Sequence, residues 1–224
     1  MCGRFTLTAD INDLQSEFPW VVIPEGIQPR YNIAPSQPVA VIPNDGHNQL
    51  DFFTWGLVPS WAKDPTIGNR LINARAETLA EKPSFRTAFR RRRCLVLADG
   101  FYEWRKSANG RGKVPMYIRL KSRRPFGFAG LWEVWHSGEG DKILSCAIIT
   151  TEPNSLVGEI HNRMPVILPE EAYAAWLDPD IQDSSQLTPL LLPYPADQMA
   201  AYPVSSAVNN PANESPECIL PLAA

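Results

Sequence analysis

Near the N-terminus, apolar residues recur at the spacing of an amphipathic helix. Ile11, Leu14 and Phe18 are separated by three and four positions, so they share one face of a helix. Thr8 precedes them, and a threonine hydroxyl can accept hydrogen bonds from the free N–H groups of a first helical turn. The pattern therefore predicts a capped helix after Thr8. Two further helices are predicted at 76–90 and 169–177.

Short runs of β-branched and aromatic residues, bounded by turn-forming residues, predominate in the middle of the chain. They lie at 38–43, 50–55, 94–98, 101–104, 115–120, 126–135 and 143–150. The last four form two pairs, and a polar glycine-containing loop joins the members of each pair, which predicts two long hairpins. Strands and helices do not alternate and no glycine-rich phosphate loop follows a strand, so the pattern argues against a doubly wound nucleotide-binding fold.

The organisation of the chain predicts one α+β domain over 1–224, with strands in its middle and helices packed around them. The 22 prolines are enriched in connections and in the C-terminal third. Since proline cannot donate a backbone hydrogen bond, we expect that third to be irregular chain packed on the body.

Composition narrows the class of protein. Of the 224 residues, 44% are hydrophobic and 20% are charged, which indicates a folded globule. No apolar run is long enough to span a membrane and the N-terminus lacks a signal-peptide stretch, so we expect a cytoplasmic protein with no membrane partner. The net charge of −3 gives no global reason to expect nucleic acid. Arginines crowd 86–93 and basic residues crowd 121–124, although each run alone is more typical of a solvated surface.

The cysteines and histidines form no metal or disulfide motif. Four cysteines lie far apart without a CxxC pair, and three histidines have unrelated spacings, so we expect no metal and no cofactor. Cys2 differs from the other cysteines by its place in the sequence "MCGRF". If Met1 is removed, as is common before a small residue, the amine and the thiol of Cys2 lie two carbons apart.

Several short stretches carry polar residues that packing alone does not explain. They lie at 30–37, 55–64, 72–78, 98–104 and 159–168. Asn73, Arg75 and Glu77 alternate, so they share a face if the chain is extended there. Each polar residue also has a structural interpretation: Asn73 can cap the helix predicted from 76, Glu103 can face solvent and His161 can be a satisfied structural residue.

Taken in order, these stretches resemble one protein family. "MCGRF", "RYNIAPSQ", "WGLVPSW", "INARAET", "ADGFYEW", "IHNRMPVIL" and "PVSSAVNNP" resemble the motifs of the SOS-response-associated peptidase (SRAP) family, from residue 2 to about 210. The resemblance implies a mainly antiparallel β-barrel-like core with surrounding helices. It also implies a positively charged groove for single-stranded DNA, and covalent crosslinking to abasic sites through an N-terminal cysteine in the SOS and DNA damage response.

The resemblance extends to individual positions. Its active-site positions match Cys2, the nucleophile, together with Asn73, Glu103 and His161. Its phosphate contacts match Arg4, Arg75 and Arg163, and its DNA-lining positions match Pro35, Trp61 and Thr150. The stretch after Trp61 is longer than the usual spacing, and Ala62 stands where a second aromatic residue often follows.

The implied chemistry explains why an N-terminal cysteine is needed. An α-amine titrates near roughly 8, well below lysine, so it is substantially neutral at cellular pH and can attack the aldehyde of an abasic site. The thiol of the same residue can then close a thiazolidine ring. Glu103 would carry protons, His161 would protonate the sugar oxygen, and Asn73 would hold the developing oxygen or the N-terminus.

Two other functions remain open at this point. The same residues could serve an N-terminal-nucleophile cysteine peptidase or amidase, with autoprocessing or lyase-type activity as variants. The tryptophans and arginines could instead form a non-catalytic single-stranded DNA damage-binding module. In the favoured interpretation, the protein is a cytoplasmic monomer that associates with the nucleoid when it is bound to DNA.

Overall fold

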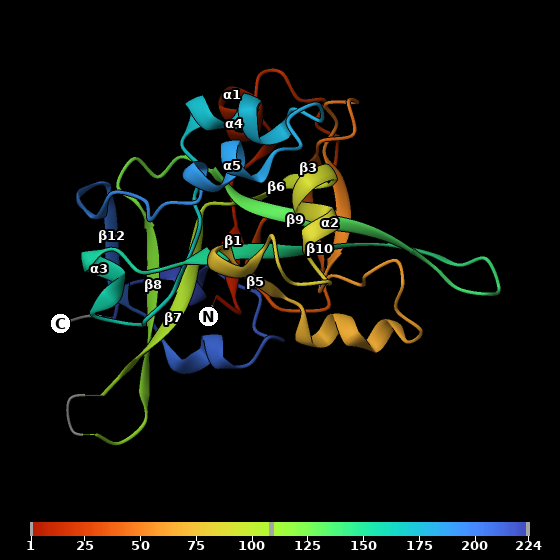
Figure 1. Cartoon of the computed structure of the whole chain (residues 1–224). Coiled ribbons are helices and arrows are strands. Elements are labelled where there is room, and N and C mark those ends of the chain that lie inside the picture. Colours follow the sequence, from red (N-terminus) through yellow and green to blue (C-terminus); the bar gives the residue numbers. More distant parts are fainter. Residues whose placement is uncertain (1, 108–109, 223–224) are drawn as a thin grey trace.

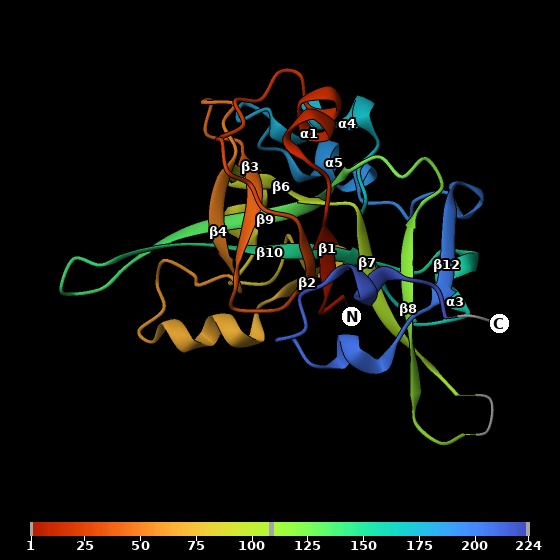
Figure 2. The same ribbon diagram turned by 180° about the vertical axis from the view of Figure 1, so that it is seen from behind.

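The core of the protein is a closed barrel (Figures 1 and 2). The computed structural model describes residues 2–107 and 110–222. The barrel strands run in the order β9 (Phe126–His136), β6 (Arg93–Ala98), β3 (Pro38–Pro43), β4 (Asp51–Trp55) and β10 (Lys142–Thr151), and β10 pairs again with β9. The β10–β4 pairing is parallel, whereas the other pairings around the barrel are antiparallel. The predicted α+β fold with a mainly antiparallel, barrel-like core is therefore confirmed.

A second sheet packs beside the barrel. Its strands lie in the order β12 (Met199–Pro203), β8 (Lys113–Leu120), β7 (Gly100–Lys106), β1 (Phe5–Leu7) and β2 (Arg30–Ile33). The seven predicted strand runs all form strands, and both predicted hairpins, β7–β8 and β9–β10, are present. Residues 108–109 of the first hairpin's loop lie outside the described residues.

The alternation of side chains along β7 serves two hydrophobic clusters. Phe101 packs into the main core against Phe128, with ring centroids 6.1 Å apart. Tyr102 faces the other way and joins a smaller cluster with Tyr117 and Val208. Successive residues of a strand point to opposite faces, so Glu103 returns to the side of Phe101.

The C-terminal end of β10 receives two short strands. β5 (Asn73–Arg75) pairs with it in parallel, and β11 (Met164–Pro165) pairs with it in an antiparallel manner. Thr150 is the common partner, opposite Arg75 on one side and Pro165 on the other. Segments far apart in the sequence therefore meet at this end of the strand.

The N-terminal helix begins later than the sequence predicts. α1 spans Ile11–Glu17, and its cap is Asp10, whose side chain accepts from two backbone N–H groups of the first turn. Thr8 instead donates its hydroxyl to Asp99 at 2.6 Å, and its backbone N–H also bonds Asp99. The prediction of Thr8 as the cap was wrong because this carboxylate, distant in sequence, binds it.

The helix predicted at 76–90 is interrupted. A 3₁₀ turn spans Ala76–Thr78, and α2 begins only at Arg86 and ends at Arg91. Pro83 explains the break, because proline disfavours the helical conformation of the preceding residue and cannot donate to the turn before it. The helix predicted at 169–177 is confirmed as α4 (Glu170–Leu177).

The C-terminal third contains more regular structure than the sequence suggests, although its turns are short. It includes β12, which pairs with β8 along its whole length. The remaining α-helices are α3 (Ser155–Gly158) and α5 (Ser184–Leu187). Its 3₁₀ turns are Thr188–Leu190, Ala196–Gln198, Ser206–Asn209 and Pro216–Ile219, and one further turn, Pro65–Arg70, lies between β4 and β5. Within the described residues, no helix has the length and apolar character needed to cross a membrane.

Candidate active site

Cys2 lies beside β7 because of the pairing of β1. The two strands are antiparallel with Phe5 opposite Phe101, so the residues before Phe5 run alongside those after Phe101. Cys2 is fully buried, and its Sγ lies 3.8 Å from the carbonyl oxygen of Arg4. Burial, and next the nearby Glu103 carboxylate, raise the pKa of the Cys2 thiol. The sulfur is therefore protonated here at neutral pH. Met1 lies outside the described residues.

Asn73 is joined to Cys2 by a hydrogen bond. From β5, its Nδ2 donates to the carbonyl oxygen of Cys2 at 2.7 Å. Its Oδ1 is buried and has no hydrogen-bond partner among the described residues, so it can still accept a proton donor. The structural interpretation of Asn73 as a helix cap was wrong, since Arg75 takes the cap position of the 3₁₀ turn that follows.

Glu103 is a carboxyl group held inside the protein. Its residue is 3% exposed, so the alternative of an outward-facing side chain was wrong. Burial raises the pKa of Glu103, and an electrostatic interaction with nearby His161 partly offsets this rise. A carboxyl group whose pKa is moved toward neutrality can both take and give a proton at working pH. Glu103 therefore lies within electrostatic range of Cys2 on one side and of His161 on the other.

His161 lies in the loop between α3 and β11. The backbone N–H of Arg163 donates to its Nδ1 at 3.1 Å. Nδ1 also lies 3.3 Å from the carbonyl oxygen of Arg163, so both main-chain polar groups of that residue hold this edge of the ring. The structure thus brings together all four residues that match the family's active-site positions.

Arg163 and Thr150 contact each other inside the protein. Arg163 donates from Nη1 and Nη2 to both carboxylate oxygens of Glu77, and Nη2 also donates to the carbonyl oxygen of Thr150 at 2.6 Å. The Arg163 side chain is 15% exposed and Thr150 is fully buried. Arg75, by contrast, is exposed. Of these residues, Arg75 and Glu77 face solvent.

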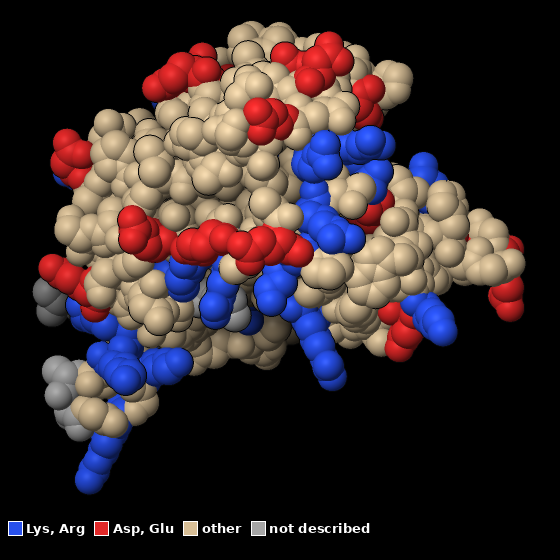
Figure 3. All heavy atoms as spheres, viewed as in Figure 1, with Lys and Arg blue, Asp and Glu red and all other residues tan. Residues whose placement is uncertain are grey.

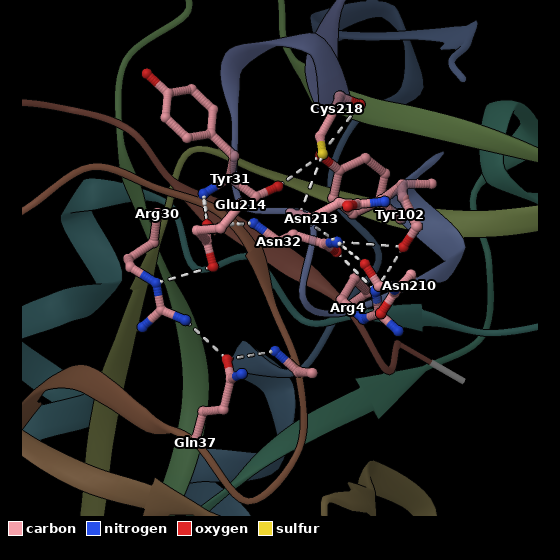
Figure 4. A network of polar contacts seen from close by, with 12 residues as sticks. Arg4, Arg30, Tyr31, Asn32, Gln37, Tyr102, Asn210, Asn213, Glu214 and Cys218 are labelled. Carbon is pink, nitrogen blue, oxygen red and sulfur yellow. Dashed lines mark hydrogen bonds and ion pairs between the residues drawn. The ribbon is translucent and has the colours of Figure 1, made fainter. Parts of the chain in front are cut away.

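Arg4 belongs to a partly buried polar network, which Figure 4 shows from close by. Its Nη1 donates at 2.7 Å both to Oδ1 of Asn32 and to the carbonyl oxygen of Val208. Its guanidinium lies 5.9 Å from the ring centroid of Trp104, and burial lowers the pKa of Arg4. Arg4 therefore fastens the segment around Val208 to the start of β1.

Asn32 and Glu214 were not among the residues matched to the site, yet they organise this network (Figure 4). Nδ2 of Asn32 donates to three backbone carbonyls of the C-terminal segment, those of Val208, Asn210 and Asn213. Glu214 accepts from Nε of Arg30 at 3.1 Å and from the backbone N–H of Asn32 at 2.9 Å. The sequence indicated this network only through the polar stretch 30–37, because the groups that Asn32 binds lie more than 170 positions away in the chain.

Trp61 and Pro35, two positions matched to the DNA-lining surface, differ in exposure. Trp61 is 58% exposed and lines a hollow of about 460 Å³ together with Lys63 and Arg70. Ala62 is buried, and its carbonyl oxygen accepts from the indole of Trp135 at 2.7 Å. Pro35 is half-buried. A single exposed indole is thus available in this loop for stacking.

The surface charge is uneven despite the negative total. Figure 3 shows acidic side chains near the top and in a row across the middle of the face seen in Figure 1, with Lys and Arg side chains below that row and a second group of them to its upper right. No group of three or more His, Cys, Asp or Glu side chains within residues 2–107 and 110–222 could hold a metal ion.

Comparisons with known proteins agree with the motifs. The model of the family described as SOS response associated peptidase (SRAP) matches residues 1–211. The abasic site processing protein YoqW of Bacillus subtilis is 52% identical over 222 residues, covering 98% of this chain and 99% of its own. The abasic site processing protein HMCES of Rattus norvegicus is 34% identical, covering 88% and 66%. A crystal structure of a protein from Bacteroides thetaiotaomicron superposes with a TM-score of 0.89 at 28% identity, covering 99% of this chain and 100% of its own.

Proposed function

The chain belongs to the SOS response associated peptidase (SRAP) family, and from this premise we propose that it processes abasic sites in DNA by crosslinking to them through Cys2. The names of relatives that are 52% and 34% identical support this substrate. The observation that carries the proposal is the meeting of Cys2 with Asn73, Glu103 and His161 at the start of β1.

The first bond forms between nitrogen and carbon. With Met1 removed, the α-amine of Cys2 attacks the aldehyde carbon of the ring-opened abasic sugar, and loss of water leaves an imine. Glu103 takes the proton released by the amine and returns one to the departing hydroxyl group. The buried Oδ1 of Asn73, beside Cys2, accepts a hydrogen bond from the amine and holds it in place.

The second bond forms between sulfur and the same carbon. The thiol adds across the imine, its proton passes through Glu103 to the imine nitrogen, and a five-membered thiazolidine results. The raised pKa of Cys2 keeps its sulfur protonated until Glu103 accepts that proton. Ring closure removes the imine that would promote strand cleavage, so the DNA is shielded.

The same proposal takes single-stranded DNA as the partner. Exposed Arg75 is suited to a phosphate contact and exposed Trp61 to stacking with a base. Arg4 and Arg163 already bind groups of the protein, so their contribution is to hold the site together. We therefore expect undamaged single-stranded DNA to bind weakly and to lose affinity as salt is added.

The test is adduct formation with single-stranded DNA that carries one abasic site. An intact mass first establishes that Met1 is absent from the purified protein. The wild-type protein should give a denaturation-resistant adduct, whereas Cys2→Ala should stop at an imine that is recovered only after borohydride reduction. An unreacted mixture of wild-type protein and damaged DNA would refute the proposal.

A pretreatment of the DNA separates this chemistry from hydrolysis of peptides. Alkoxyamine caps the aldehyde of the abasic site and should abolish the adduct. A cysteine peptidase would be indifferent to it, so an adduct that survives capping would exclude the aldehyde route.

A further inference from the structure

Glu77 holds Arg163 in a two-pronged ion pair. Nη1 of Arg163 donates to Oε1 of Glu77, and Nη2 donates to Oε2 at 3.0 Å. This arrangement matches the planar fork of a guanidinium to a carboxylate and fixes its orientation as well as its distance. The hydrogen bond from Arg163 lowers the pKa of Glu77, so the pair stays ionised at neutral pH.

Arg163 also joins the end of β10. Its Nη2 donates to the carbonyl oxygen of Thr150 at 2.6 Å, at the residue where β5 and β11 flank β10. Glu77 lies in the 3₁₀ turn that directly follows β5. One guanidinium therefore connects the segment that carries Asn73 to the loop that carries His161.

The same arginine fixes the ring of His161 through its main chain. Its backbone N–H donates to Nδ1 of His161 at 3.1 Å. The loop before it is anchored at its start, where the N–H of His161 bonds the carbonyl oxygen of Val157 at 2.8 Å. The second anchor, at Arg163, lies two residues beyond the ring. Loss of the ion pair would remove the anchor of the Arg163 side chain on Glu77 and leave only its bond to Thr150 and the pairing of β11 with β10 to hold that end of the loop.

We propose that Glu77 is a positioning residue, which acts through Arg163 to hold the ring of His161 in register with Glu103 and Cys2. This inference rests on the proposed function of those three residues. It differs from the reading of Arg163 as a phosphate contact, in which Glu77 would only compete with DNA for the guanidinium. If Glu77 positions Arg163, its loss should slow adduct formation and leave DNA affinity unchanged. If Glu77 competes with phosphate, its loss should strengthen DNA binding and leave the rate unchanged.

The decisive variant is Glu77→Gln, which keeps the size of the side chain and removes its charge and one acceptor. We expect single-turnover adduct formation at saturating DNA to slow about tenfold, because a small misplacement of a catalytic group is costly. The dissociation constant for undamaged single-stranded DNA should stay within about twofold of wild type, since no DNA contact is removed. Glu77→Asp should recover part of the rate, whereas exposed Glu81→Gln should change neither quantity.

A second measurement needs no DNA, so it separates this proposal from the proposed function. The nitrogen chemical shifts of His161, whose Nδ1 is held by the main chain of Arg163, should be the same in the wild-type protein and in Glu81→Gln. They should move toward the values of a solvated imidazole in Glu77→Gln. Arg163→Lys, which keeps the charge and loses the fork, should give the same change and guards against misfolding of the first variant.

Unchanged nitrogen chemical shifts of His161 in Glu77→Gln would overturn the positioning role even if the wild-type protein formed no adduct. Tighter DNA binding at an unchanged rate would also overturn it, and would make Glu77 a competitor of phosphate.

Discussion

Tyr102 and Glu103 are neighbours on β7, and both are buried, but they face opposite sides of the sheet. The Tyr102 hydroxyl donates to the carbonyl oxygen of Tyr31 at 2.7 Å and packs among aromatic rings. Glu103 faces the side of Cys2 and His161. Burial raises the pKa of both side chains.

The same direction of pKa change has different consequences on the two faces. A phenol is already neutral at working pH, so a raised pKa leaves Tyr102 in its ordinary state and costs nothing. A carboxyl group is ordinarily charged, so burial of Glu103 opposes its usual state. An ionisable group that is held where its ordinary charged state is unfavourable is typical of a catalytic site, so Glu103 is a candidate catalytic residue. Tyr102, which keeps its ordinary neutral state, is explained by packing alone.

The largest effect on the rate of adduct formation should come from Glu103, on the face of β7 that is turned toward Cys2. Glu103→Gln removes the proton carrier and should slow adduct formation about 100-fold. Tyr102→Phe should leave the rate within about twofold, while the loss of its hydrogen bonds lowers the free energy of unfolding by about 1–2 kcal/mol. Single-turnover crosslinking and urea denaturation of both variants measure these quantities. A similar loss of rate in Tyr102→Phe would mean that the two faces are not separate.

Substitution of a glycine on the Tyr102 face of β7 should have a smaller effect, and only on the free energy of unfolding. A Cβ built on Gly100 would lie 2.2 Å from the hydroxyl oxygen of Tyr117, which bonds Thr6 at 2.9 Å. Gly100→Ala must displace that ring, so we expect a loss of about 1–3 kcal/mol in urea denaturation. Gly138→Ala is the matched control, because nothing lies within 4 Å of its added Cβ. Equal stability of the two variants would contradict the close packing of Tyr117.

The sequence predicted the barrel strands well because their β-branched and aromatic runs are local signals. It did not predict the parallel pairing of β10 with β4, which closes the barrel, nor β12, whose short run lies among prolines. Family resemblance, and not spacing, selected Cys2, Asn73, Glu103 and His161. It could not indicate that Arg4 binds Asn32, because that contact depends on the register of two strands and a distant segment.

The smallest effect concerns how stability depends on pH. Burial raises the folded-state pKa of Glu103 above its ordinary value near 4.5, so the folded state binds its proton more tightly than the unfolded state does. Its contribution to stability is fully present below about pH 4.5 and is lost as the pH rises through the folded-state pKa. Glu103→Gln lacks this titration.

The free energy of unfolding of that variant, relative to wild type, should therefore increase with pH in this window. One group can contribute a slope of at most about 1.4 kcal/mol per pH unit. Tyr102→Phe should show no such slope there, because its phenol stays neutral throughout. Urea denaturation of the three proteins from pH 4 to pH 8 measures the difference. A flat difference for Glu103→Gln would mean that the carboxyl group is solvated as well in the folded protein as in the unfolded chain, and the contrast between the two faces of β7 would fail.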